Sequence, residues 1–103
     1  TDSANGEITI DTWQLVLATF DGAGNCVLYK NGVDVTDAAA GTHAPVADAV
    51  ENLYFSCLQN GTGPVTLHNY MSGGVWDYRI WNRCYTPGDA MNLFELERHW
   101  FNA

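Results

Sequence analysis

The fold is decided by Gly73-Gly74-Val75-Trp76-Asp77-Tyr78-Arg79-Ile80-Trp81-Asn82-Arg83-Cys84-Tyr85-Thr86-Pro87-Gly88-Asp89-Ala90, in which two glycines open a strand pattern that runs into a helix start. Side chains alternate along a strand, so residues 75–82 place large rings on both faces, and we expect both faces to be partly covered. Thr86 suits the helix cap and Pro87 the first helical position, while the charge of Asp89 complements the helix dipole. The stretch therefore predicts a strand followed by a capped helix.

A second informative pattern lies upstream. Residues 13–20 are apolar on both alternating faces, which predicts a strand in the middle of a sheet. A turn cluster over 21–25 and a returning strand over 26–30 follow. Asn31-Gly32 suits a two-residue hairpin turn, because both residues tolerate positive φ angles. With a third strand over 33–36, the pattern predicts a three-stranded meander.

The remaining segments complete an all-β prediction. We expect short strands over 8–10, 53–58 and 65–70, and a long loop over 37–50. From Pro87 the apolar residues keep helical spacing, and the helix could extend to Trp100. Regularly spaced strands with turn signals between them predict an antiparallel β-sandwich with one C-terminal helix.

A single domain over residues 8–103 is expected, after a flexible arm or linker end over residues 1–7, which are small and polar. The chain begins at Thr1 without an initiator Met, so we expect a processed product or a piece of a longer protein.

The quoted stretch resembles a known family. Its run G-x-W-D-Y-R-I-W-N-R-x-Y-T-P-x-D is similar to the closing segment of laminin-G-like domains, which belong to the concanavalin A-like jelly-roll superfamily. Residues 13–22 and the L-Y-K-N-G run at 28–32 resemble the hairpin of the same family. The resemblance spans roughly residues 8–97 and implies a shortened jelly roll. Family domains are usually nearer twice this length, and the chain resembles their C-terminal half.

Composition limits the partners of the chain. The hydrophobic fraction is 47%, which argues against disorder. Four basic residues stand against twelve acidic ones, giving a net charge of −8 that repels phosphate backbones and anionic lipid. We therefore expect no nucleic acid partner and no membrane partner. Cys26, Cys57 and Cys84 are expected to be reduced, buried small hydrophobes.

Catalytic patterns are weak, and we predict that the protein is not an enzyme. Glycosidases on a jelly roll carry paired carboxylates on one strand face, as in E-x-D-x-x-E, and this spacing does not occur in the sequence. His43, His68 and His99 fall in a predicted loop, strand and tail, without a nucleophile elbow.

Binding patterns are more informative. The resemblance implies a calcium site at one rim of the sandwich, to which Asp21, Asn25 and Asp77 would contribute, with solvated turn acids as the alternative. The candidate glycan-binding residues are His43, Asn69 and Tyr70, of which His43 in a loop and Tyr70 at a strand end are expected to be exposed.

Other prominent side chains are assigned to structure. Of the large rings in predicted strands, we expect most to be core; these rings are Trp13, Tyr29, Trp76 and Trp81. Arg79 and Arg83 are expected to pair with carboxylates such as Asp77, and Thr86 to cap the helix.

Two kinds of function follow as hypotheses. The first is a lectin-like binding or adhesion module, which the resemblance implies. The second is a structural assembly or decoration subunit of a virion or cell surface, and a degenerate glycosidase fragment is a remote third. Either main reading suggests an extracellular or particle-surface location. Because a strand that is apolar on both faces needs cover, we expect a protein partner or a homo-oligomer to complete the sheets.

Overall fold

The computed structural model describes residues 3, 5–37, 58–60, 66–68 and 70–101. It divides the chain into two compact units, one made of Thr1–Pro45 with Trp81–Ala103 and the other of Val46–Ile80. The predicted loop over 37–50 lies outside the described residues except for Asp37. None of the helices in the described ranges is long and apolar enough to cross a membrane.

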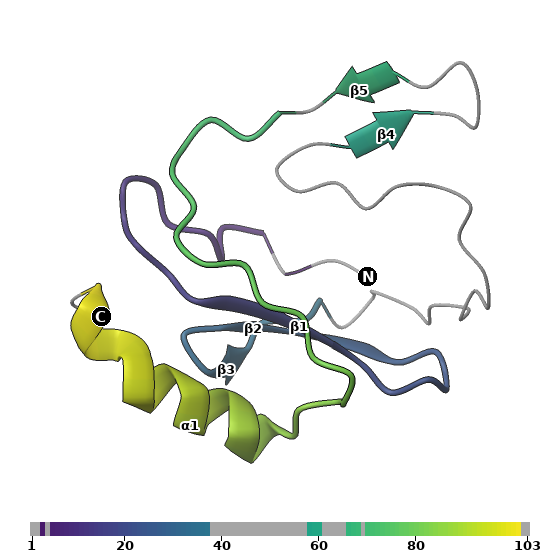
Figure 1. The fold of residues 1–103 in the computed structure, drawn as a ribbon, viewed down its shortest axis with the longest axis vertical. Coiled ribbons are helices and arrows are strands. Elements are labelled where there is room, and N and C mark those ends of the chain that lie inside the picture. The colour runs from purple at the N-terminus through teal and green to yellow at the C-terminus, as the bar shows by residue number, and fades with distance from the viewer. Residues whose placement is uncertain (1–2, 4, 38–57, 61–65, 69, 102–103) are drawn as a thin grey trace. The chain divides into compact units, whose positions relative to one another are not determined.

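The first unit contains a three-stranded antiparallel sheet and a C-terminal helix (Figure 1). Strands β1 (Val16–Phe20), β2 (Cys26–Lys30) and β3 (Val33–Asp34) lie in the order β1-β2-β3. The predicted meander and helix are confirmed, so the chain is β-rich with one C-terminal helix. The sequence predicts a central strand over residues 13–20, whereas among the described strands β1 stands at one end of the sheet.

The turn between β2 and β3 follows from its two residues. Asn31 has φ 50° and Gly32 has φ 81°, the left-handed conformations that the predicted hairpin turn requires. Asn31 also ties the turn to the chain just before β1. The Leu15 N–H donates to Asn31 Oδ1 at 3.0 Å, and the Asn31 N–H donates to the Leu15 carbonyl at 2.9 Å.

The helix begins as the sequence predicts. α1 (Pro87–Glu97) is followed by the 3₁₀ turn η1 (Arg98–Trp100). The Asp89 N–H donates to Thr86 Oγ1 at 3.1 Å, and the Thr86 N–H donates to Asp89 Oδ2 at 3.0 Å. These reciprocal bonds form a capping box, which satisfies backbone donors that a helix start otherwise leaves unpaired.

The core lies between the sheet and the first turn of α1. Leu17 and Tyr29 are opposite each other on β1 and β2, and both pack against Ala90, which is completely buried. Phe94 lies one turn further along the same helix face and is also buried. Leu96 is 72% exposed, so the apolar spacing identifies the buried positions correctly only in part.

Two predicted strands are absent from the described parts of the chain. Residues 8–10 form no strand, and Ile10 is 84% exposed. Residues 75–82 form neither strand nor helix, and Asp77 has φ 68°, outside the β region. A residue in that conformation interrupts the alternation of side chains, so the pattern of residues 75–82 does not become a strand.

Two described points connect the predicted N-terminal arm to the sheet. Ser3 forms an isolated antiparallel bridge with Thr36, and the Lys30 ammonium donates to the Glu7 carbonyl.

The second unit contains a two-stranded antiparallel hairpin of β4 (Leu58–Asn60) and β5 (Thr66–His68). Gln59 is opposite Leu67 in this pair. β5 lies within the predicted strand over 65–70. The predicted strand over 53–58 meets β4 only at Leu58, because residues 53–57 lie outside the described residues.

Candidate functional site

Two of the three proposed calcium ligands come together in the turn between β1 and β2. Asp21 Oδ1 accepts hydrogen bonds from the N–H groups of Ala23 at 2.8 Å and Asn25 at 3.1 Å. The Asn25 side-chain amide donates to Asp21 Oδ2 at 2.6 Å, and this bond is the main reason that the pKa of Asp21 lies below its ordinary value. Both carboxylate oxygens therefore hold the turn, which gives Asp21 a structural role.

The third proposed ligand belongs to the second unit. Asp77 Oδ2 lies 2.8 Å from Arg79 Nε, which confirms the predicted pairing of Arg79 with a carboxylate. Among the described residues, no group of three or more His, Cys, Asp and Glu side chains is placed to hold a metal ion. Calcium binding remains a prediction.

Residues 70–80 of the second unit display a series of exposed rings. Tyr70 is 70% exposed, as predicted, while Trp76 at 56% and Tyr78 at 48% are also exposed. The expectation that Trp76 is core is wrong, because residues 75–82 do not join a sheet. His43 and Asn69, the other candidate glycan ligands, lie outside the described residues.

Of the other three rings that the sequence assigns to the core, one is buried and two are exposed. Tyr29 is 2% exposed, as predicted, whereas Trp13 is 53% exposed and Trp81 is 37% exposed. Tyr29 lies in a paired strand and packs against the helix. Trp13 lies before the first residue of β1, and Trp81 lies in the predicted strand over 75–82, which does not form. The Trp81 ring lies close to the Tyr85 ring, with centroids 4.8 Å apart.

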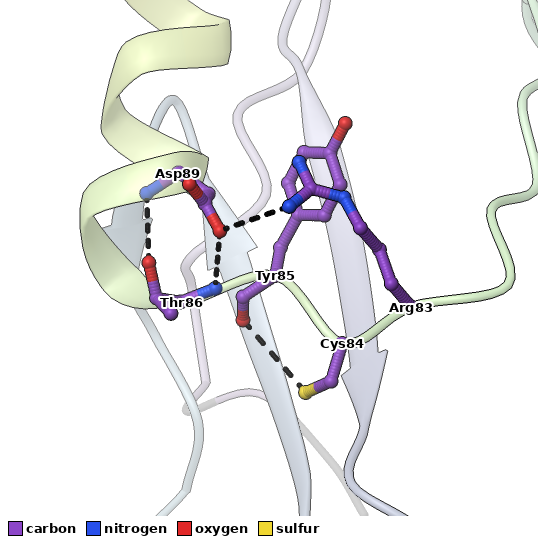
Figure 2. Close-up of polar contacts among 5 residues, drawn as sticks. All are labelled: Arg83, Cys84, Tyr85, Thr86 and Asp89. Carbon is purple, nitrogen blue, oxygen red and sulfur yellow. Dashed lines mark hydrogen bonds and ion pairs between the residues drawn. The ribbon is translucent and has the colours of Figure 1, made fainter.

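The helix start carries a cluster of polar contacts that serves structure (Figure 2). Arg83 Nη1 lies 3.7 Å from Asp89 Oδ2, and the guanidinium lies 4.4 Å above the centre of the Tyr85 ring. The pKa of Asp89 is lowered chiefly by the N–H of Thr86, with a smaller contribution from Arg83. The Asp89 carboxylate accepts from the Thr86 N–H and pairs with Arg83, so it completes the helix cap and has little hydrogen-bonding capacity left for a ligand.

The cysteine prediction holds at one of the two described positions. Cys26 is buried with a free thiol, as expected. Cys84 is free but exposed, because it lies in the unpaired chain before the helix, where its thiol donates to the Tyr85 carbonyl at 3.8 Å (Figure 2). Cys57 lies outside the described residues.

The face of β1 opposite the helix is an exposed apolar surface, on a strand for which the sequence predicts two apolar faces. Val16 is 61% exposed and Phe20 is 57% exposed, with exposed Ala18 between them, while Leu17 and Thr19 on the other face are buried. The sequence shows which side chains of this strand share a face, but it does not show whether other residues cover that face.

Comparison of the chain with family models, with curated proteins and with solved structures gave no match.

Proposed function

We propose that this chain is a non-catalytic binding module, built like the C-terminal half of a laminin-G-like, concanavalin A-like β-sandwich. The proposal is supported by the meander with its Asn-Gly turn and by the capped helix, which occur in the order that the resemblance implies. An extracellular or particle-surface location belongs to the same proposal.

The observation that carries the binding role is the exposure of aromatic side chains over residues 70–80. Trp76 and Tyr70 present more than half of their surface to solvent, and rings of this kind stack on the apolar faces of sugars. Asp77 and Arg79, close to Trp76 in the sequence, form an ion pair whose side chains are 40% and 32% exposed, and they offer acceptors and donors to hydroxyl groups. The ligand class that suits this combination is a glycan.

A glycan array probed with the full chain tests the proposal, with and without added Ca²⁺. Trp76→Ala should weaken binding to any retained glycan by at least about tenfold, equivalent to about 1.4 kcal/mol. Trp13→Ala is the matched control, because Trp13 is exposed to nearly the same extent, 53% against 56%, but lies in the other unit. An array without any retained glycan, or equal loss in both variants, would contradict the glycan-binding role.

A second candidate function, protein assembly, is favoured by a separate observation. Among the described strands β1 stands at one end of its sheet, and Val16 and Phe20 on one of its faces are more than half exposed; exposed apolar surface of this kind marks sites of contact with another protein. In this role the chain would complete its sheet against a partner, as a structural or decoration subunit does. Native mass spectrometry of the chain after purification would reveal such a complex, and a monomer without any retained protein would contradict this function.

A further inference from the structure

The dipeptide Asn-Gly occurs three times in the chain, at residues 5–6, 31–32 and 60–61. Glycine has no side chain to hinder its backbone nitrogen, so in this dipeptide that nitrogen can reach the carbonyl carbon of the asparagine side chain. The third pair runs into residues outside the described part of the chain. The first two pairs are described, and their surroundings differ.

The pair at the β2–β3 turn is held in place by the fold. Asn31 Oδ1 accepts from the Leu15 N–H at 3.0 Å, and the Asn31 N–H donates to the Leu15 carbonyl at 2.9 Å. Gly32 is buried, and a Cβ added there would lie only 3.0 Å from Met91 Cα. The Asn31 side chain would have to give up its bond to Leu15 and rotate within this packed turn before its carbon met the Gly32 nitrogen. The fold therefore keeps the two reacting atoms apart.

The pair at residues 5–6 lies in an exposed turn. Both Asn5 and Gly6 are exposed, and a Cβ added to Gly6 would meet no described residue within 4 Å. The turn lies between two points that attach residues 3–7 to the sheet. Ser3 forms its bridge with Thr36 on one side, and the Glu7 carbonyl accepts from the Lys30 ammonium on the other.

We propose that Asn5 is a site of spontaneous modification, at which the side-chain amide becomes a carboxylate, and that the fold protects Asn31 from the same reaction. Hydroxide removes the proton of the Gly6 N–H, and the electron pair left on that nitrogen forms a bond to the Asn5 side-chain carbon. The bond from this carbon to the amide nitrogen breaks, and that nitrogen takes a proton from water and leaves as ammonia. Water then opens the cyclic imide at either carbonyl, which leaves aspartate or isoaspartate at position 5.

The modification changes the segment that joins the two attachment points. Each product adds one negative charge to a chain whose net charge is −8. Isoaspartate also adds an atom to the backbone, because the main chain then runs through Cβ and Cγ of residue 5. This atom falls between Ser3 and Glu7, whose contacts with the sheet have a set spacing. Isoaspartate at position 5 should therefore loosen the attachment of residues 3–7.

Incubation of the full chain at mildly alkaline pH, folded and in concentrated urea, tests the proposal by mass spectrometry of peptides that pepsin releases at acidic pH. In the folded chain Asn5 should convert at least about tenfold faster than Asn31, about the factor that one lost hydrogen bond represents. In urea the two rates should become similar, because the following residue is glycine in both pairs. Intact Asn5, equal rates in the folded chain, or an Asn31 that stays as slow in urea would each overturn the proposal.

Two variants separate the reaction from its effect on the chain. Gly6→Ala places a methyl group beside the attacking nitrogen and should slow conversion at position 5, with Asn31 as the internal control; conversion at the original rate would refute attack by that nitrogen. Asn5→Asp carries the added charge without the longer backbone. Hydrogen exchange over residues 1–10 should be faster in the isoaspartyl fraction of the aged chain than in Asn5→Asp, and equal exchange would refute the loosening.

Discussion

Gly32→Ala tests how the helix is attached to the sheet. Gly32 has φ 81°, and a Cβ added there would lie 3.0 Å from Met91 Cα, 3.1 Å from Met91 Sδ and 3.2 Å from Phe94 Cβ. The Met91 sulfur belongs to a side chain that can move, but Met91 Cα is part of the helix backbone. The turn and the helix would therefore have to separate.

Two costs contribute to the expected loss. A left-handed conformation costs a residue with a Cβ about 1–2 kcal/mol. Overpacking a close contact costs about 1–3 kcal/mol more. The total loss of about 2–5 kcal/mol is a large fraction of the roughly 5–15 kcal/mol by which a domain is stable.

Gly22→Ala supplies the matched control. Gly22 has φ 77°, nearly the same as Gly32, but an added Cβ meets nothing within 4 Å. Gly22→Ala should therefore carry only the backbone cost of about 1–2 kcal/mol. Urea unfolding followed by tryptophan fluorescence gives both free energies of unfolding. Equal losses in the two variants would refute the packing of α1 on the β2–β3 turn.

Three further predictions concern stability. Thr86→Ala removes the hydrogen bond from the Asp89 N–H to the Thr86 hydroxyl and should lower the free energy of unfolding by about 0.5–2 kcal/mol. Thr86→Ser keeps a hydroxyl and should retain most of the stability lost in Thr86→Ala. Equal stability of the two variants in urea unfolding would contradict the role of Thr86 as the cap. Hydrogen bonds in the folded chain lower the pKa values of Asp21 and Asp89, so the two carboxylates stabilise the fold at neutral pH and this stabilisation should be lost as the pH falls below about 4. Asp21→Asn should therefore reduce the loss of stability at acidic pH. An unchanged acid loss in the variant would contradict the role of Asp21. Desolvation, and to a smaller extent the charge of Asp34, raises the pKa of Tyr29, so the free energy of unfolding should fall as the pH rises above about 10. Tyr29→Phe should remove this alkaline loss of stability. A loss of the same size in the variant would contradict the assignment of that loss to Tyr29.

The sequence predicted those elements whose signals are local. Asn31-Gly32 specifies its hairpin turn through the φ angles of its own two residues, and Thr86 with Asp89 specifies the helix start through bonds three residues apart. The pairing of Arg79 with Asp77 is equally short in range. In each of these cases the residues that determine the structure are neighbours in the chain.

The sequence failed where the outcome depends on distant parts of the chain. The alternating rings of residues 75–82 suit a strand, but a strand forms only where a neighbouring edge accepts it, and Asp77 adopts a left-handed conformation instead. Residues 16–20 are apolar on both faces whether β1 is flanked by strands of its own chain or stands at an edge. The exposure of Trp76, on which the proposed binding surface depends, could not be predicted from neighbouring residues, because it also depends on whether distant parts of the chain cover this ring.

The central claim, that residues 70–80 form the binding surface, is tested most directly by observing the indole N–H signals of the four tryptophans by NMR during titration with a glycan retained on the array. The account predicts that the Trp76 signal shifts in a saturable way while the Trp13 signal, from an equally exposed ring, stays in place. Saturable binding in which Trp76 does not move, or in which Trp13 moves as much, would contradict it.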